Sequence, residues 1–367
     1  MAEARKWRTV VPVMLLTVII AVVSYSRATP TLPQGRHPVT GEPKVFTYNA
    51  RTGETQALPS AVYQVDLPGG SSPLFVRRLK VGETQVLMAE PGSGTPWLQA
   101  SPDHKRYVCK ANGSLYLLDA ATLSIRVLTP DTIGAHKRQE LLERVADSEA
   151  GLVWADQPLW DAGGTRVLYV SNRKGVADGS EYMEAWAVNV DTGHHELLFE
   201  HPGFYLLGLH EHELIFDDGI GIWAYDLQTG ALRVLVQHGR PLGFGSGLVM
   251  TAEDYLASEQ LVVTNVVSGD QYLLTAPQDK TFCRAAAAPD GVTLVAVLRD
   301  RDGNHHLACY SLGKGDTGVS RVIELPTGPV TIGDITFLDA GRLLVNTHQA
   351  VGGLAEEAGW VVEVTGG

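Results

Sequence analysis

The chain has 367 residues, of which 44% are hydrophobic and 19% charged, with 39 glycines and a formal net charge of −12. This composition excludes a disordered chain and fits a turn-rich globular protein with a sizeable core. Because an acidic body is repelled by phosphate backbones, the charge argues against nucleic acid as a partner. The three cysteines, Cys109, Cys283 and Cys309, are too scattered for a disulfide framework or metal cluster, so we expect small apolar side chains on strands.

An apolar segment lies close to the N-terminus. Residues 9–26 contain no charge and follow a short basic segment, residues 1–8. As a helix this segment reaches roughly 25 Å, close to the thickness of a hydrocarbon layer. We therefore predict a transmembrane signal-anchor helix, with the N-terminus in the cytoplasm and the body outside. The alternative is a cleaved signal peptide, which would leave a secreted or periplasmic body, although only residues 24–26 offer small residues for cleavage.

The remainder divides into a linker and a long β-rich region. Residues 27–43 are rich in Pro, Thr and Gly and lack periodicity, which predicts an extended linker. From residue 44 to residue 367, short β-rich runs alternate with turn residues, as is typical of an all-β fold. Within this region, residues 132–149 place three apolar residues on one helical face among charges, so we predict a helical insertion there.

A first type of turn recurs along the β-rich region. A polar residue closes one strand, and Thr, Ser or Gly follows three or four positions later. We expect the polar side chain to cap the turn and the glycine to take the positive φ that closes a hairpin loop. The clearest members begin at Asn49, Asp119, Asn189, Asp226 and Asn265, and a weaker one begins at Arg78.

A second type of turn lies upstream of the first in several units. It centres on Asp103, Asp161, Asp290 and Asp339, each between a short strand and a longer one. One unit is therefore about four short strands joined by two turn types. The intervals between units scatter around the about 40–50 residues that are usual for a propeller blade.

These units predict an all-β fold, a β-propeller of seven four-stranded blades, with six or eight blades as alternatives. The interval from Asn49 to Arg78 is too short for a full blade, and the last unit ends without a fourth strand. Both departures are explained if residues 44–50 form the outer strand of the final blade and so join the two ends of the chain. Such closure removes exposed strand edges, which invite aggregation.

The repeat also carries a family resemblance. The turn Ser101-Pro102-Asp103-His104, followed by a strand and then by Leu-Tyr-Leu-Leu-Asp-x-x-Thr at residues 115–122, resembles the WD-like repeats of TolB-type β-propellers. Asp103 and Asp290 are the best matches, and His104 occupies the place of Gly291 in the sister unit. The resemblance covers residues 44–367 and implies an extracytoplasmic recognition propeller. It supplies no catalytic residues.

Candidates for chemistry are sparse. Residues 244–247, Phe-Gly-Ser-Gly, lack the spacing of a serine-hydrolase elbow and are interpreted as a glycine loop between blades. The histidine pairs 194–195 and 305–306 cannot each hold one ion, because adjacent strand residues point to opposite faces. We expect residues 210–212, His-Glu-His, in an exposed turn. Residues 300–304, Asp-Arg-Asp-Gly-Asn, lack the spacing of a calcium loop and predict an Asp-Gly hairpin.

The sequence thus assigns no catalytic, metal-binding or cofactor-binding residue and no cofactor. It predicts a membrane-anchored, extracytoplasmic propeller that acts as a non-enzymatic scaffold. The expected partner is another envelope or extracellular protein, a peptide or a glycan. The alternative is a propeller enzyme, a metal-dependent lyase or hydrolase with its site in the central channel.

Overall fold

A computed structural model describes residues 45–68, 73–90, 98–111, 113–130, 154–174, 182–254, 258–313, 319–326, 330–351 and 354–364. All of them belong to one unit, His37–Gly367. The predicted anchor at 9–26, the linker at 27–43 and the helical insertion at 132–149 lie outside these ranges. Within them, no helix is long and apolar enough to cross a membrane.

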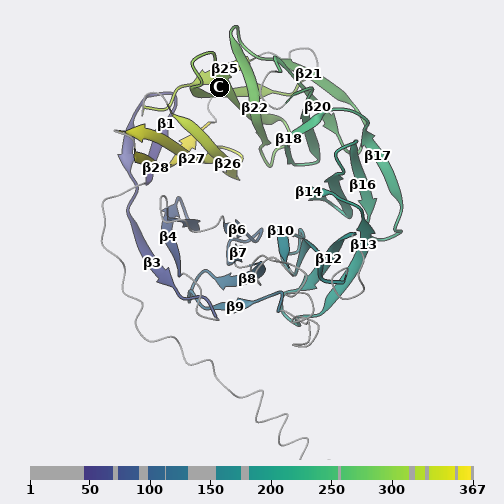
Figure 1. The fold of residues 1–367 in the computed structure, drawn as a ribbon. Coiled ribbons are helices and arrows are strands. Elements are labelled where there is room, and N and C mark those ends of the chain that lie inside the picture. The colour runs from purple at the N-terminus through teal and green to yellow at the C-terminus, as the bar shows by residue number, and fades with distance from the viewer. Residues whose placement is uncertain are drawn as a thin grey trace, which may run out of the picture. The chain divides into compact units, whose positions relative to one another are not determined.

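The described strands form seven sheets arranged around a common axis (Figure 1). Blade 1 consists of β3 (Ser60–Val65), β4 (Leu74–Val81) and β5 (Thr84–Ala89), and blade 2 of β6 (Leu98–Ala100), β7 (Arg106–Ala111), β8 (Ser114–Asp119) and β9 (Ile125–Val127). Blade 3 consists of β10 (Ala155–Trp160), β11 (Arg166–Ser171), β12 (Met183–Asn189) and β13 (His195–His201). Blade 4 consists of β14 (Tyr205–His210), β15 (Glu213–Asp217), β16 (Ile222–Asp226) and β17 (Leu232–Val236).

The other three blades complete the ring. Blade 5 consists of β18 (Arg240–Gly245), β19 (Leu248–Ala252), β20 (Gln260–Asn265) and β21 (Gln271–Thr275), and blade 6 of β22 (Lys280–Ala287), β23 (Thr293–Asp300), β24 (His305–Ser311) and β25 (Val319–Ile323). Blade 7 consists of β26 (Thr331–Asp339), β27 (Arg342–Val351) and β28 (Leu354–Glu363), with β1 (Val45–Asn49) and β2 (Thr55–Ala57). The predicted seven-bladed propeller is confirmed. The prediction of four strands in every blade is wrong for blades 1 and 7.

Blade 7 joins the two ends of the β-rich region, as predicted. Strand β1 pairs with β28 in parallel register, with Val45 opposite Gly359 and Asn49 opposite Glu363. The Asn49 Nδ2 group also donates to Glu363 Oε2 at 2.8 Å. Strand β2 pairs on the other side of β1, so β1 is the fourth strand of five and not the outermost.

Blade 1 runs in the opposite sense to the other six. Its last strand, β5, lines the central channel, whereas the other blades line it with their first strand. Figure 1 shows β3 outside β4. The predicted turn at Arg78 is wrong because Arg78 lies within β4, and its Nη2 donates across to Ala120 O of blade 2 at 2.6 Å. The short interval from Asn49 to Arg78 is therefore not an interval between two turns, because Arg78 does not lie in a turn.

The first type of turn is capped as predicted at all five clear members, and glycine takes the positive φ at four of them, whereas Leu123 takes it after Asp119. At each one, the side-chain Oδ1 accepts hydrogen bonds from the backbone N–H groups two and three residues ahead, at 2.7–3.1 Å. In the second type, Asp290 Oδ1 accepts from the N–H groups of Val292 and Thr293. His104 takes a φ of 57° where Gly291 takes 68°, as expected from the alignment of the two units.

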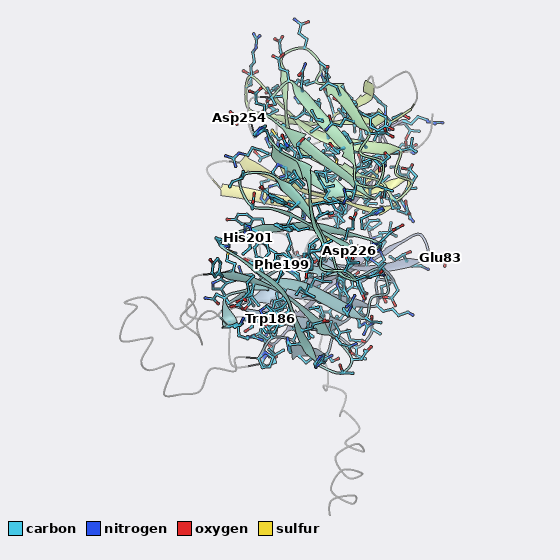
Figure 2. All side chains as sticks on the ribbon, turned by 90° about the vertical axis from the view of Figure 1, so that its right-hand side faces the viewer. Glu83, Trp186, Phe199, His201, Asp226 and Asp254 are labelled. Atoms are coloured by element: carbon cyan, nitrogen blue, oxygen red, sulfur yellow. The ribbon has the colours of Figure 1, made fainter. Side chains whose placement is uncertain are left out.

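Apolar side chains fill the spaces between neighbouring blades. Figure 2 labels Phe199, which lies between blades 3 and 4. The centroid of its ring lies 5.1 Å from that of Phe204, 5.1 Å from that of Phe216 and 4.7 Å from that of Tyr225. The three cysteines form no disulfide and lie on strands, as predicted. Aromatic rings that pack edge to face or offset add to the stabilisation from burial alone.

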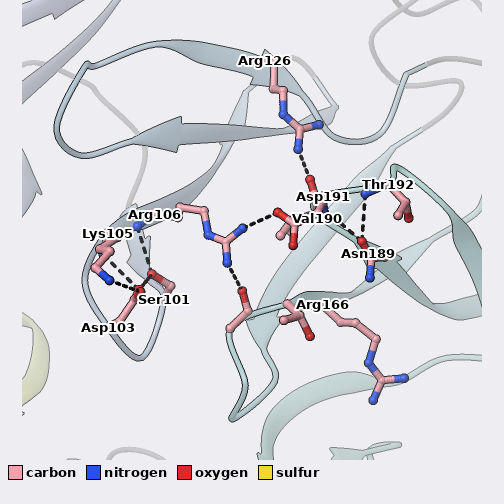
Figure 3. Close-up of polar contacts among 12 residues, drawn as sticks. Ser101, Asp103, Lys105, Arg106, Arg126, Arg166, Asn189, Val190, Asp191 and Thr192 are labelled. Atoms are coloured by element: carbon pink, nitrogen blue, oxygen red, sulfur yellow. Dashed lines mark hydrogen bonds and ion pairs between the residues drawn. The ribbon is translucent and has the colours of Figure 1, made fainter. Parts of the chain in front are cut away.

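Polar contacts link blades 2 and 3 where their turns meet (Figure 3). The Arg106 guanidinium donates to Asp191 Oδ1 at 2.8 Å and to Gly164 O at 2.5 Å. Arg126 donates to the carbonyl oxygen of Val190. The turn residues therefore serve two purposes: they close hairpins within a blade and hold adjacent blades together.

Candidate functional site in the central channel

A cavity of about 860 Å³ lies where the innermost strands of all seven blades face one another. Its wall is formed by β5, β6, β10, β14, β18, β22 and β26, with further side chains from β7 and β27. Most of the lining is apolar, including Leu159, Leu206, Phe244, Ile335 and Phe337. A cavity of this size lies within the range of ligand-binding sites, and its apolar lining favours apolar groups of a ligand.

The charged groups of the wall are paired with each other. Lys110 Nζ of blade 2 lies 2.5 Å from Asp156 Oδ2 of blade 3. Next to this pair, Gln157 has a φ of 52° within the bulge of β10, and its Oε1 accepts from Leu206 N at 2.6 Å. Two successive side chains thus tie blade 3 to both of its neighbours.

Two amide oxygens of the wall have no hydrogen-bond partner within the described part of the chain. They are Gln99 Oε1 on β6 and Asn346 Oδ1 on β27, and both atoms are buried. A buried acceptor without a donor costs about 1–3 kcal/mol. A ligand that brings N–H or O–H groups to these atoms would remove that cost.

His104 and Tyr107 lie at the end of the channel formed by the turn of blade 2. The Tyr107 hydroxyl accepts from Leu87 N at 2.9 Å and lies 3.5 Å from His104 Nδ1. Burial raises the pKa of Tyr107 to about 12, and burial lowers the pKa of His104 against the opposing charge of Asp103. Both side chains are therefore neutral near pH 7. The hydrogen bond from Leu87 N to the Tyr107 hydroxyl links blade 1 to blade 2.

The histidine groups found in the sequence are separated from one another and from the channel wall. His195 Nδ1 lies 2.9 Å from the Tyr169 hydroxyl, and His306 Nε2 lies 2.9 Å from Asp300 Oδ2. Glu211 and His212 lie in the turn between β14 and β15, but His210 is the last residue of β14. Of the three only Glu211 is exposed, so the prediction of an exposed turn at 210–212 is correct only in part. In the ranges that the structure describes, no group of three or more His, Cys, Asp or Glu residues could hold a metal ion.

Two further predicted turns can be placed. Ser246 lies in the turn between β18 and β19, where its Oγ donates to Ala288 O at 2.7 Å. The glycine loop at 244–247 therefore lies within blade 5 and not between blades, which corrects the prediction. The Asp-Gly hairpin is confirmed, because Asp300 Oδ1 accepts from the N–H groups of Asp302 and Asn304.

The channel residues themselves were not found from the sequence. Lys110, Gln99 and Asn346 lie outside the recurring turns, so nothing in the repeat distinguishes them. Gln157 likewise has no sequence signal, because its position depends on a bulge in the pairing of β10 with β11. A side chain that points inward differs from one that packs between blades only through long-range register.

No protein-family model and no curated protein matches the sequence. Among solved structures, an oligogalacturonate lyase in complex with manganese has a TM-score of 0.54 and 12% identity over 85% of this chain and 86% of the lyase. An acylaminoacyl peptidase of Pyrococcus horikoshii has a TM-score of 0.52 and 12% identity over 92% of this chain and 53% of the peptidase. This chain therefore spans about half the length of the peptidase.

TolB from Acinetobacter baumannii is also similar, with a TM-score of 0.42 and 13% identity over 92% of this chain and 88% of TolB. Identities this low show the fold alone. At that level, the similar structures with TM-scores above 0.5 confirm the predicted resemblance to β-propeller proteins. The fold is shared by binding scaffolds and by enzymes, so function has to be argued from the site.

Proposed function

We propose that this protein is a membrane-anchored, extracytoplasmic binding scaffold whose central channel binds an apolar peptide segment of another envelope or extracellular protein. The anchor and the location rest on the apolar segment at residues 9–26. The acidic net charge excludes nucleic acid from the proposal.

The observation that carries the proposal is the apolar wall of the channel. Leu159, Leu206 and Phe337 come from three different blades and line one cavity. Burial of apolar surface contributes about 25 cal/mol per Å², so an apolar side chain gains by entering this cavity. A scaffold that binds a peptide and catalyses no reaction needs only a surface of matching shape on a rigid fold.

A peptide fits this wall better than a glycan does. A sugar carries a hydroxyl on most of its carbon atoms, and each buried hydroxyl needs a partner. Several polar groups of the wall are already paired, because Lys110 and Asp156 pair with each other and Gln157 Oε1 accepts from Leu206 N. The two unpaired acceptors, Gln99 Oε1 and Asn346 Oδ1, suit the sparse N–H groups of an extended peptide backbone.

The test is an affinity selection of displayed random peptides on the full-length protein in lipid nanodiscs. We expect the enriched peptides to share apolar residues and to compete with one another. Ala286→Trp fills the channel from β22 and should weaken binding by at least about tenfold. Gln99→Leu, which removes one unpaired acceptor at nearly constant volume, should weaken it by a smaller factor.

The matched control is Val267→Trp, which adds the same side chain at an exposed turn of blade 5. It should bind the selected peptides as the wild type does. Peptides that bind the Ala286→Trp protein as tightly as the wild type would place the binding surface outside the channel and overturn the proposal. A selection without a common motif would do the same.

The enzyme alternative makes a different prediction. A metal-dependent lyase or hydrolase requires side chains of several blades to hold one divalent ion. Elemental analysis of protein purified without chelator separates the two functions. Stoichiometric metal favours the enzyme, whereas metal-free protein that binds the selected peptides favours the scaffold.

A further inference from the structure

A second cavity, of about 540 Å³, lies between blades 5, 6 and 7 and shares no described lining residue with the channel. Its wall comes from residues near the start of β18, β24 and β26, from the middle of β22, from the end of β23, and from His348 on β27. The volume falls within the about 300–1,000 Å³ typical of small-molecule sites.

The lining of this cavity is basic, although the protein as a whole is acidic. Arg284, Arg299, His305 and His348 line it, together with the thiol of Cys283. Among the described lining residues there is no carboxylate. With a net charge of −12 on the chain, such a concentration of basic groups needs a physical reason.

Two bulges build the cavity. The register of β22 against β23 shifts between Phe282 and Arg284, so Cys283 and Arg284 line the same cavity although they are neighbours in sequence. In a regular strand such neighbours point to opposite faces. The register of β26 shifts at Gly333, where an added Cβ would lie 2.8 Å from His348 Nε2.

The hydrogen-bond partners leave several donors available. His305 Nδ1 accepts from Ile332 N at 3.0 Å, so the proton of the neutral imidazole is on Nε2. Arg284 Nη1 lies 3.2 Å from Asp334 Oδ1, but both side chains are about half exposed, at 53% and 52%. Such an exposed pair contributes little. Within the described ranges, Arg299 forms no ion pair.

The two guanidinium groups act on the same neighbours. Burial lowers the pKa of His305, and the charges of Arg299 and Arg284 lower it further. Burial raises the pKa of Cys283, and the same two charges oppose that rise. Arg284 and Arg299 line the same cavity as this imidazole and this thiol. A bound anion would offset the positive charge of the two guanidinium groups.

We propose that this cavity is an anion site, which binds a carboxylate or phosphate group of a small ligand between Arg284 and Arg299. The planar guanidinium presents paired N–H donors that match either group, and hydrogen bonds to charged partners are about twice as strong as neutral ones. His305 Nε2 supplies a further donor. This site is independent of the peptide function proposed for the channel.

The test is isothermal titration calorimetry of the full-length protein in nanodiscs, in chloride-free buffer at pH 7.5, with inorganic phosphate and with malonate as probes. We expect saturable binding of at least one probe, and the tighter of the two identifies the group. Arg299→Gln and Arg284→Gln should each weaken binding by about threefold to fivefold, as expected for the loss of a charged partner at an exposed side chain.

The matched control is Arg301→Gln, which removes one positive charge from the same β23–β24 hairpin outside the cavity, where Arg301 pairs with Asp279. Its binding should change by less than about twofold, because only a screened long-range charge is lost. The proposal is overturned if neither probe saturates, or if the Arg299 and Arg301 variants weaken binding equally. Arg299 is exposed, so its substitution should leave the melting temperature unchanged.

Discussion

Lys110 of β7 and Asp156 of β10 form an ion pair that crosses from blade 2 to blade 3 at the wall of the channel, with 2.5 Å between Nζ and Oδ2. Because the two side chains are 45% and 36% exposed, the pair contributes under about 1 kcal/mol to stability. Because the two side chains pair with each other, neither leaves an uncompensated charge beside the apolar wall. The channel therefore keeps its preference for apolar groups.

Removal of one partner should weaken binding more than it weakens the fold. Lys110→Met leaves Asp156 uncompensated, and we expect the selected peptides to bind about tenfold less tightly. Lys110→Met with Asp156→Asn should restore most of that loss, because no charge then remains. Peptide affinities and urea unfolding of the three proteins check this, and equal affinities in both variants would contradict it.

The buried pair of blade 1 should behave differently. Arg77 donates through Nε and Nη2 to both carboxylate oxygens of Glu90 at 2.6 Å, and the side chains are only 3% and 12% exposed. Glu90→Gln should lower the free energy of unfolding by about 3–5 kcal/mol, because it leaves a buried charge unpaired. Asp334→Asn, which breaks an exposed pair, should change it by under about 0.5 kcal/mol. If the two variants lost similar amounts of unfolding free energy, burial would not explain how much each ion pair contributes.

Gly243 should not tolerate a side chain. A Cβ there would lie 1.9 Å from the carbonyl oxygen of Ala285, where β18 meets β22. Gly243→Ala should therefore destabilise the protein by at least about 1–3 kcal/mol in urea unfolding. Gly203→Ala is the control, since a Cβ there meets nothing within 4 Å. A Gly243→Ala protein as stable as the control would show that blades 5 and 6 can separate at low cost.

The junction of β1 with β28 can be tested through one aromatic pair. Phe46 and Trp360 stack with ring centroids 5.1 Å apart. Phe46→Ala should lower the free energy of unfolding by about 2–4 kcal/mol. The substitution removes apolar contacts and also weakens the pairing of β1 with β28 that closes the propeller. The exposed Tyr205 provides the control, and Tyr205→Ala should have a far smaller effect. If the two variants lost equal amounts of unfolding free energy, the junction of β1 with β28 would not contribute to the stability of the propeller.

Stability should fall as the pH falls from 7.5 to 5.5. Burial lowers the pKa of His104, His195 and His305, so the unfolded chain binds protons more readily than the folded protein below about pH 6.5. Asp290 and Asp300 have lowered pKa values and titrate below this range. Urea unfolding at pH 5.5, 6.5 and 7.5 measures the slope.

One of these histidines can be removed without loss of a charge pair. His195→Gln eliminates a buried imidazole that lies beside the Tyr169 hydroxyl. The variant should show a shallower dependence of unfolding free energy on pH than the wild type. An unchanged slope would show that His195 does not contribute to acid sensitivity.

The sequence by itself determined the features that depend on near neighbours. Asn49 and Asp119 cap their turns through backbone N–H groups only two and three residues ahead, so a pattern of a few residues contains the whole interaction. The number of blades and the closure by residues 44–50 followed from the spacing of these turns, although one turn in that series, at Arg78, lies within β4. The similarity to TolB-type propellers rested on the same local pattern.

Only the tertiary structure decided which side chains line the two cavities. The reversal of blade 1 places β5 in the channel, and the bulges at Gln157 and Cys283 turn side chains toward cavities. A shift of one residue in strand register moves a side chain to the opposite face, and register depends on partners far away in the chain. The channel wall and the anion site are therefore properties of long-range pairing, which no local pattern contains.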